Sequence, residues 1–257
     1  MATLTTQPGR FTGVSQILRY NWHFYVAAGI LDLIATLLLV FATSLPGLIR
    51  FAIFLAAIGA GFWAVSSLLV SHFVYDRSPL YEFTWLTAVL RDNPKSWVNI
   101  HAGLDQTTDK LIQIFPTLNP RVLDIYDSSL MSEPSIARAR RRTDDLTPSR
   151  SASPFALPLR DAEFETIFLI FVAHELRHRS ARLRFFREVV RSLKPGGRVV
   201  LVEHLRDFNN FVAYGPGALH FFSRSEWLRV CSQAGLFSLA ELSVTPFIRC
   251  LVFTKFS

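Results

Sequence analysis

The sequence predicts an α/β fold in which a doubly wound parallel sheet with a closing antiparallel strand pair follows a two-helix transmembrane hairpin. Two apolar stretches in the first 74 residues are each long enough to cross a hydrocarbon core of about 30 Å, which predicts the hairpin. Beyond residue 96, apolar runs alternate with amphipathic ones, a pattern typical of parallel strands joined by helices. Two further apolar runs, 237–244 and 247–254, predict the closing antiparallel pair.

The hairpin consists of the stretches Trp22–Thr43 and Leu48–Val74, joined by a turn that contains Pro46 and Gly47. Aromatic residues cluster at its ends, as they do at membrane interfaces. A cleaved signal peptide is not expected, because the first stretch is too long and a second one follows directly. The alternative interpretation is a soluble hairpin that is buried against the C-terminal domain.

The charges next to the hairpin predict its orientation. The basic residues on the open side of the hairpin are Arg10, Arg19, Arg77, Arg91 and Lys95, against Arg50 alone near the turn. By the positive-inside rule both termini face the cytoplasm, which predicts a location in the cell (inner) membrane with the C-terminal domain on the cytoplasmic side. Cys231 and Cys250 match no metal or redox spacing, which suits a reducing compartment.

The net charge of +7 raises the question of an anionic partner. We interpret the basic residues of the helices at 138–142 and 177–191 as solvated faces, with contact to anionic lipid headgroups as a second interpretation. Nucleic acid is not an expected partner, because these basic residues lack interleaved aromatic side chains. An oligomeric state is not predicted.

Three segments follow from these patterns: a polar tail at 1–20, the hairpin with an interfacial connector at 21–95, and an α/β domain at 96–257. In the domain, the expected strands are 97–101, 121–125, 164–173 and 198–202, and the expected helices are 107–115, 132–142, the segment that ends at 193, and 223–234. Residues 143–158 are rich in Ser, Pro, Asp and Arg and predict a loop.

The segment Phe185–His204 reads FFREVVRSLKPGGRVVLVEH. It combines an amphipathic helix, a Lys-Pro-Gly-Gly stop signal and a buried strand that ends in an acid. This order resembles the second half of class I S-adenosylmethionine-dependent methyltransferases, and the resemblance covers residues 96–257. The run 164–176 resembles the fourth strand of small-molecule methyltransferases, including quinone C-methyltransferases. The resemblance implies a Rossmann-like methyltransferase sheet, S-adenosylmethionine as cofactor and an enzyme that transfers a methyl group.

The resemblance also implies cofactor-binding residues at the ends of the first two strands. In the family, the first strand ends in an acid and a glycine-rich turn, whereas this chain has His101 in place of the acid and keeps only Gly103 of the glycines. Gly103 can still adopt a positive φ, and Asp105 offers a substitute hydrogen-bonding group. At the end of the second strand, Asp124 best matches the acid that accepts hydrogen bonds from the ribose hydroxyls, and Asp127 is the second candidate.

Histidines follow the fourth and fifth strands, at the edge where doubly wound sheets bind ligands. The resemblance implies that His174 and Glu175 lie near the transferred methyl group, while His204 ends the fifth strand. His220 lies in an aromatic loop that resembles the acceptor loop of the family. We expect one of these histidines to remove an acceptor proton, with Glu175 or Glu203 orienting it.

The sequence therefore predicts a membrane-anchored methyltransferase with an apolar small-molecule or lipid-like acceptor taken from the bilayer. Two alternatives stay open. The missing glycines favour a catalytically inactive scaffold or partner protein. The run His174-Glu175-Leu176-Arg177-His178 also matches the metal motif of zinc metalloproteases, which requires all five residues on one helix.

Overall fold

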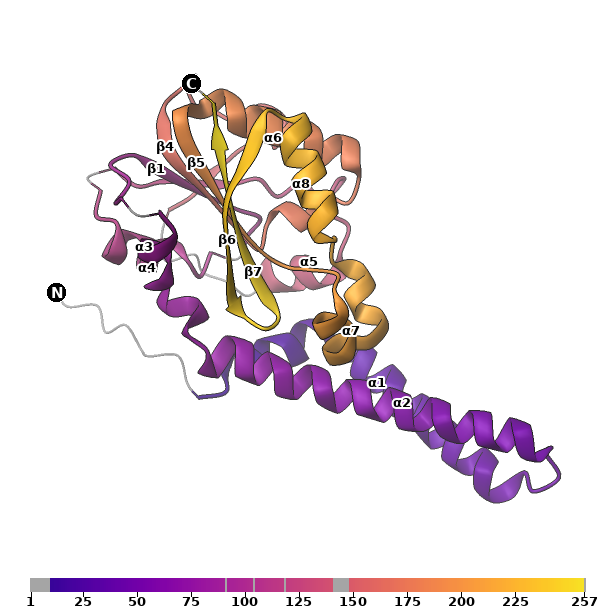
Figure 1. The fold of residues 1–257 in the computed structure, drawn as a ribbon. Coiled ribbons are helices and arrows are strands. Elements are labelled where there is room, and N and C mark those ends of the chain that lie inside the picture. Colours follow the sequence, from indigo (N-terminus) through magenta and orange to yellow (C-terminus); the bar gives the residue numbers. More distant parts are fainter. Residues whose placement is uncertain (1–9, 91, 104, 118, 141–147, 257) are drawn as a thin grey trace. The chain divides into compact units, whose positions relative to one another are not determined.

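The computed structural model describes residues 10–90, 92–103, 105–117, 119–140 and 148–256. This part of the chain forms two compact units, which are coloured along the sequence in Figure 1. The hairpin unit comprises residues 10–78 and 208–217. The sheet unit comprises the described residues of 79–207 and 218–256.

Two long antiparallel helices, α1 (Thr12–Phe41) and α2 (Gly47–His72), form the hairpin (Figure 1). Pro46 occupies the N-cap of α2, where it ends the turn between them. A third helix, α7 (Phe208–Tyr214), comes from far along the chain and packs on α2. The segments Thr12–Phe41 and Gly47–Glu82 are long and apolar enough to cross a membrane, and their most apolar windows are not buried within the protein.

The start of α1 is held by a carboxylate from the end of the hairpin. Asp76 lies in η1 (Phe73–Arg77), a π-helical continuation of α2. Its two oxygens accept hydrogen bonds from the N–H groups of Gly13 at 2.6 Å and Val14 at 3.1 Å, which a helix start otherwise leaves unpaired. Helical structure therefore begins inside the predicted polar tail, and a kink at Asn21 separates it from the apolar span.

The sheet unit contains one seven-stranded sheet with the order β3-β2-β1-β4-β5-β7-β6. Its strands are β1 (Trp97–His101), β2 (Arg121–Asp124), β3 (Arg150–Ser151), β4 (Phe164–Ile170), β5 (Leu193–His204), β6 (Leu236–Thr245) and β7 (Ile248–Lys255). The first five are parallel to one another, whereas β7 is antiparallel to both β5 and β6. The predicted parallel sheet and closing antiparallel pair are confirmed.

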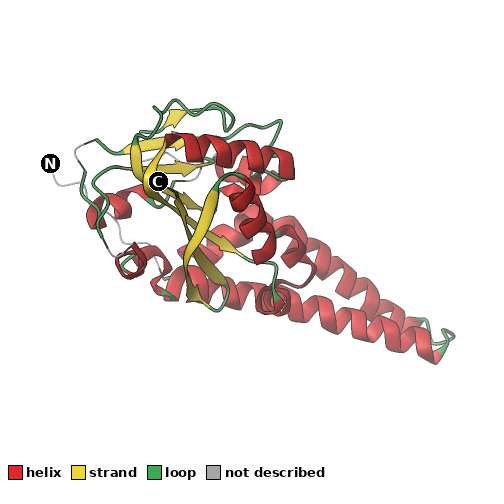
Figure 2. Ribbon diagram, turned by 45° about the horizontal axis from the view of Figure 1, so that its top comes forward, coloured by secondary structure: helices red, strands yellow, loops and turns green. Residues whose placement is uncertain are grey.

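Helices cover both faces of this sheet (Figure 2). One face packs against α5 (Pro134–Arg140), α6 (Arg179–Ser192) and α8 (Arg224–Gln233). The other face is covered by η2 (Pro79–Glu82), α3 (Trp85–Leu90) and α4 (Thr108–Ile114). On that side the Trp97 indole donates to the carbonyl of Phe115 at 2.9 Å and packs on Phe168. The central strands β1, β4 and β5 thus send alternate side chains into two separate apolar layers.

Two element boundaries differ from the sequence prediction for identifiable reasons. β4 ends at Ile170 rather than at residue 173, because Phe171 adopts a positive φ of 52° that extended structure does not allow. β5 begins at Leu193 rather than at residue 198, so that Lys194-Pro195-Gly196-Gly197 lies within this strand, directly after α6 ends at Ser192. The final carbonyls of α6 instead accept hydrogen bonds from the backbone N–H groups of the segment before β4.

The predicted helix at 132–142 is shorter in the structure, where α5 covers Pro134–Arg140 and residues 141–142 lie outside the described part. Similarly, residues 143–147 of the predicted loop are not described, and the remainder contains the short strand β3.

The solvated face predicted for the Arg-rich helix is wrong for Arg182. Its side chain is buried and donates to the carbonyls of Leu176 and Arg177 and to the Glu226 carboxylate, each at 2.8 Å. A guanidinium has five N–H donors, so this one residue can join α6, the turn before it and α8.

Candidate functional site

The candidate site lies at the carboxyl ends of β1, β2, β4 and β5. β1 is paired with β2 on one side and with β4 on the other. From β2 the chain continues to β3 at one edge of the sheet, whereas from β4 it continues to β5 on the opposite side. Such a change of direction opens a crevice outside the strand ends, where doubly wound sheets bind ligands. His101 and Asp124 are directly paired residues of β1 and β2, so the first two predicted cofactor residues lie side by side at this edge.

The turn after β1 is closed by His101. Its Nδ1 accepts a hydrogen bond from the N–H of Gly103 at 3.0 Å, and Gly103 adopts a φ of +103° that favours glycine. The Nε2 atom of the same ring is buried and has no hydrogen-bond partner among the described residues. The imidazole therefore shapes the turn through Nδ1, while Nε2 carries the ring proton and can donate it to a ligand.

Asp105 has a structural role at the start of α4. One carboxylate oxygen accepts hydrogen bonds from the N–H groups of Thr107 and Thr108, both at 3.0 Å, so Asp105 satisfies the donors of this helix start. Asn99 of β1 fixes the same turn through the hydroxyls of the two threonines. The other oxygen of Asp105 is buried and unpaired within the described part of the chain.

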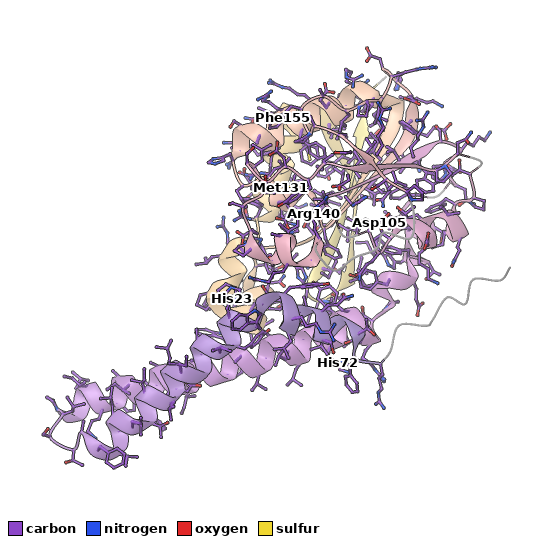
Figure 3. The ribbon with its side chains drawn as sticks, turned by 180° about the vertical axis from the view of Figure 1, so that it is seen from behind. His23, His72, Asp105, Met131, Arg140 and Phe155 are labelled. Carbon is purple, nitrogen blue, oxygen red and sulfur yellow. The ribbon has the colours of Figure 1, made fainter. Side chains whose placement is uncertain are left out.

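Asp124 lies at the end of β2 with its carboxylate largely buried. One oxygen accepts the N–H of Tyr126 at 3.0 Å, and the other accepts the Arg140 guanidinium at 2.7 Å. The Arg140 side chain stacks on the Tyr126 ring at 4.2 Å and lies so close over Gly103 that an added Cβ there would collide with it. Figure 3 labels Arg140 and Asp105 in this region. Arg140 therefore covers the glycine through which a ligand would approach the backbone.

Asp127, the second acid predicted for the ribose, folds its own turn. Its carboxylate accepts the Ser129 hydroxyl at 2.6 Å and the Ser129 N–H at 2.9 Å, and these hydrogen bonds lower the pKa of Asp127. This arrangement is that of an Asx turn, in which the acid satisfies nearby backbone groups.

A second cluster of predicted residues lies at the ends of β4 and β5. The positive φ of Phe171 turns the chain after β4 into η3 (Ala173–Glu175), which carries His174. The His174 Nδ1 atom lies 2.7 Å from a carboxylate oxygen of Glu203, and its Nε2 atom lies 3.4 Å from Glu175. The backbone N–H of His174 also donates to Glu203 at 3.3 Å. The imidazole is thus fixed between two acids.

These acids decide the charge of His174. Burial by itself would lower the pKa of His174, but the carboxylates of Glu203 and Glu175 outweigh it and raise this pKa to about 10. Burial correspondingly opposes ionisation of Glu175, while its contact with His174 lowers the pKa of Glu175 overall. His174 is therefore an imidazolium at neutral pH, with both ring nitrogens donating.

His220, at the end of η4 (Gly215–His220), has the opposite character. Its ring lies 5.6 Å from that of His174 in an edge-on arrangement, and its carbonyl accepts the Arg177 guanidinium at 2.7 Å. Burial and the positive charges of His174 and Arg177 lower the pKa of His220 to about 4. Its Nδ1 atom lies 3.4 Å from Glu133 of the loop before α5. His220 is consequently neutral at pH 7 and keeps a lone pair that can accept a proton.

His204 occupies an aromatic environment at the end of β5. Its ring stacks on Phe221 with the centroids 4.7 Å apart, and Phe171 lies 5.7 Å away on a tilted plane. The three predicted histidines are therefore gathered within one region, since Phe221 directly follows His220.

Sequence reasoning missed Arg140, Arg177 and Glu133 as parts of this region. Arg140 and Arg177 sit in stretches that resemble ordinary solvated basic helices, and Glu133 precedes a proline in a loop. Arg140 lies 16 positions from its partner Asp124, and Glu133 lies 87 positions from His220. Arg177 donates to the carbonyl of His220, 43 positions away. No local spacing signals such contacts.

The metalloprotease alternative is contradicted by the backbone. His174 and Glu175 lie on η3, whereas His178 is the extended N-cap residue before α6. The five residues of the motif therefore do not share one helix, which zinc binding by this motif requires. Among the residues that the structure describes, no group of three or more His, Cys, Asp and Glu side chains is placed to hold a metal ion.

Comparison with known proteins agrees with this fold. Residues 119–201 match the family model described as "Methyltransferase domain". A solved SAM-dependent methyltransferase from Aquifex aeolicus aligns with a TM-score of 0.51 and 18% identity, covering 69% of this chain and 93% of that chain. No curated protein matches the chain.

Two further solved structures are similar at lower scores. A SAM-dependent methyltransferase from Thermotoga maritima, described as a possible histamine N-methyltransferase, has a TM-score of 0.47 and 17% identity over 74% of this chain and 96% of that chain. A SAM-dependent methyltransferase from Methanosarcina mazei has a TM-score of 0.48 and 15% identity over 67% of this chain and 97% of that chain. The sheet unit thus has the class I methyltransferase fold, and the family match supports S-adenosylmethionine as its cofactor.

Proposed function

We propose that this protein is a membrane-anchored S-adenosylmethionine-dependent methyltransferase that modifies an apolar small-molecule or lipid-like acceptor. The observation that carries this proposal is the paired state of two neighbouring histidines in a methyltransferase fold. His174 is charged and fixed by two carboxylates, while His220 is neutral and available as a base. Oppositely shifted groups in one crevice are typical of sites that carry out acid–base chemistry.

The residues at the ends of β1 and β2 fit the cofactor. When bound, S-adenosylmethionine supplies an electrophilic methyl group on a sulfonium centre. The Asp124 carboxylate uses two of about four lone-pair sites for Tyr126 and Arg140, which leaves capacity for a ribose diol. Gly103 offers close backbone approach once Arg140 moves away, and the unpaired Nε2 of His101 faces a buried environment beside it.

On the acceptor side, His220 would remove the proton from an acceptor hydroxyl or activated carbon. His174 would act as a fixed donor rather than a base, because its proton is stabilised by Glu203 and Glu175. His204, stacked on Phe221, would form an apolar and aromatic wall beside them. Positioning of this kind and exclusion of water are the main contributions that a protein makes to transfer between two bound reactants.

The hairpin supports the remaining parts of the proposal. Its two helices are apolar and exposed along their length, as lipid-facing helices are. The basic residues on the open side of the hairpin favour a cytoplasmic position for the sheet unit, on the side where the cofactor is made. An enzyme held at a bilayer is suited to acceptors that dissolve in it, hence the apolar acceptor class.

The missing glycines and the position of Arg140 over Gly103 favour one second candidate, an inactive protein of the same fold. Calorimetric titration of S-adenosylmethionine into the detergent-purified chain separates the two. We expect micromolar binding that Asp124→Ala abolishes, with Asp109→Ala on α4 as a control that leaves it unchanged. A folded chain without detectable binding would support the inactive scaffold.

A further inference from the structure

We propose that the segment 208–217 is a third membrane-contacting element, which places the apolar face of α7 in the cytoplasmic boundary of the lipid bilayer. This inference rests on the proposed membrane insertion of the hairpin. It adds a lipid contact made by the loop that leads into His220.

The first observation is that α7 belongs to the hairpin by packing, although it lies between β5 and α8 in sequence. It packs on α2 and forms one compact unit with it. The ring of Phe211 meets that of Trp63 edge-on with centroids 5.8 Å apart. The Tyr214 side chain meets that of Ser71, two turns further along α2.

The packing of this segment on α2 requires a glycine at position 215. It adopts a φ of +55°, and a Cβ on this residue would collide with the Trp63 indole. Only glycine satisfies both conditions without strain. The segment is therefore shaped to fit the C-terminal part of α2.

The second observation is the depth at which α7 meets α2. An α-helix rises by about 1.5 Å per residue, so Trp63 lies about 22 Å and Ser71 about 34 Å along the axis from Leu48. A hydrocarbon core of about 30 Å that begins near Leu48 therefore ends between Trp63 and Ser71. The segment 208–217 contacts both of these residues, which places α7 at the boundary between acyl chains and headgroups.

The third observation is the character of the face that α7 leaves open. Phe208, Phe211 and Val212 are 79%, 45% and 41% exposed, at the spacing of one helical stripe, while Asn210 and Ala213 are buried. No Asp, Glu, Lys or Arg occurs between Asp207 and Arg224. A phenylalanine-rich stripe without charge, continuous with a helix that faces lipid, fits the acyl boundary of a bilayer.

The consequence concerns the route of the acceptor. His220 follows Gly217 by three positions, so the lipid-contacting segment leads directly into the proposed base. An acceptor dissolved in the bilayer would thus meet a part of the acceptor loop while still in lipid.

A single introduced thiol can report the environment of α7. The native Cys231 and Cys250 are buried, and burial raises the pKa of both thiols, so they react slowly with maleimides. We would place Phe208→Cys in the full chain, label it with the environment-sensitive fluorophore NBD, and reconstitute it into phosphatidylcholine–phosphatidylglycerol nanodiscs. Val212→Cys provides a second reporter on the same stripe. Leu37→Cys reports the hairpin, and Ser238→Cys on β6 is the aqueous control.

The proposal predicts blue-shifted emission from positions 208 and 212 and quenching by doxyl groups on the lipid chains, as at position 37. Position 238 should be quenched only by aqueous iodide. If position 37 is in lipid while 208 and 212 are quenched only by iodide, the inference about α7 fails, whereas the proposed membrane insertion of the hairpin is supported. If position 37 is itself quenched only by iodide, the proposed anchor fails together with the inference.

Discussion

In the proposed cofactor site, Arg140 and the ribose would compete for the carboxylate of Asp124. Its guanidinium donates to Asp124 at 2.7 Å, as a ribose hydroxyl would, and its stem covers Gly103. Cofactor binding at this proposed site would therefore require Arg140 to leave Gly103 and to share or release Asp124. In the ligand-free protein the same contact keeps a buried carboxylate paired, which avoids the cost of an isolated charge.

We accordingly expect Arg140→Ala to bind S-adenosylmethionine about 1.4- to fivefold more tightly, since a partly exposed ion pair is worth about 0.2–1 kcal/mol. Calorimetry on the detergent-purified variant measures this change. Arg138→Ala on the same helix is the matched control and should leave the affinity unchanged. Weaker binding by Arg140→Ala would show instead that the guanidinium contacts the cofactor directly.

The two histidines predict the pH dependence of methyl transfer. His220 must be neutral to accept a proton, so activity should rise with pH through its pKa of about 4. His174 must stay protonated to hold both carboxylates, so activity should fall as pH rises through its pKa of about 10. Transfer of tritiated methyl groups to a lipid extract, followed across this pH range, measures both limbs.

Glu203→Gln tests the assignment of the alkaline limb. Removing this negative charge lowers the pKa of His174, so the alkaline limb should move to lower pH while the acid limb stays in place. Glu241→Gln, which alters a surface pair with Arg224, should move neither limb. An alkaline limb that does not move in Glu203→Gln would exclude His174 as its origin.

At the scale of elements, the sequence identified the strands well because burial patterns are local. β1, β2, β6 and β7 lie within one residue of their predicted bounds, since each is a short apolar run next to turn residues. The start of β5 differs more, since the sequence predicts residue 198 and the strand begins at Leu193. The last carbonyls of α6 are satisfied by a distant segment, so Lys194 to Gly197 can extend β5. Local signals mark where an element can end, but tertiary hydrogen bonds decide where it does.

In the candidate site, the sequence predicts which residues come together but not their charges or hydrogen-bond partners. His174, Glu175 and His204 could be proposed from strand ends, because topology brings such ends together, and His220 from the resemblance of its aromatic loop. Their charges could not, since the shifts of His174 and His220 depend on Glu203 and Arg177 in three dimensions. The structural capping by Asp105 and the pairing of Arg140 with Asp124 also depend on side-chain directions that spacing does not encode.

Arg182 gives a stability prediction for the joint between α6 and α8. Its side chain is 3% exposed and bonded to Glu226 and two carbonyls, so Arg182→Ala leaves buried acceptors unpaired. We expect the free energy of unfolding to fall by about 2–4 kcal/mol. Urea unfolding of the full chain in detergent, followed by circular dichroism, measures this loss.

The exposed Arg187 on the same helix provides the comparison. Arg187→Ala should change the free energy of unfolding by no more than about 0.5 kcal/mol. Equal losses in the two variants would mean that general helix propensity, rather than the buried network of Arg182, accounts for the effect.

At the scale of the whole molecule, the proposed function depends on which side of the membrane the sheet unit occupies. S-adenosylmethionine is a charged molecule that does not cross a bilayer freely, so the crevice has to open to the compartment that makes it. By the positive-inside rule, the distribution of basic residues predicts that the turn between α1 and α2 faces away from the cytoplasm. A single thiol on each side tests this in intact cells, because the native cysteines are buried.

We expect Ser44→Cys, in the hairpin turn, to react with a membrane-impermeant maleimide in intact cells with a permeabilised outer envelope. Ser238→Cys, on the exposed side of β6, should react only after the inner membrane is lysed. The opposite pattern would put the crevice away from its cofactor and argue against methyl transfer in the cell. Reaction of both thiols only after lysis would show that α1 and α2 do not cross the membrane, and the acceptor would then no longer need to be a molecule of the bilayer.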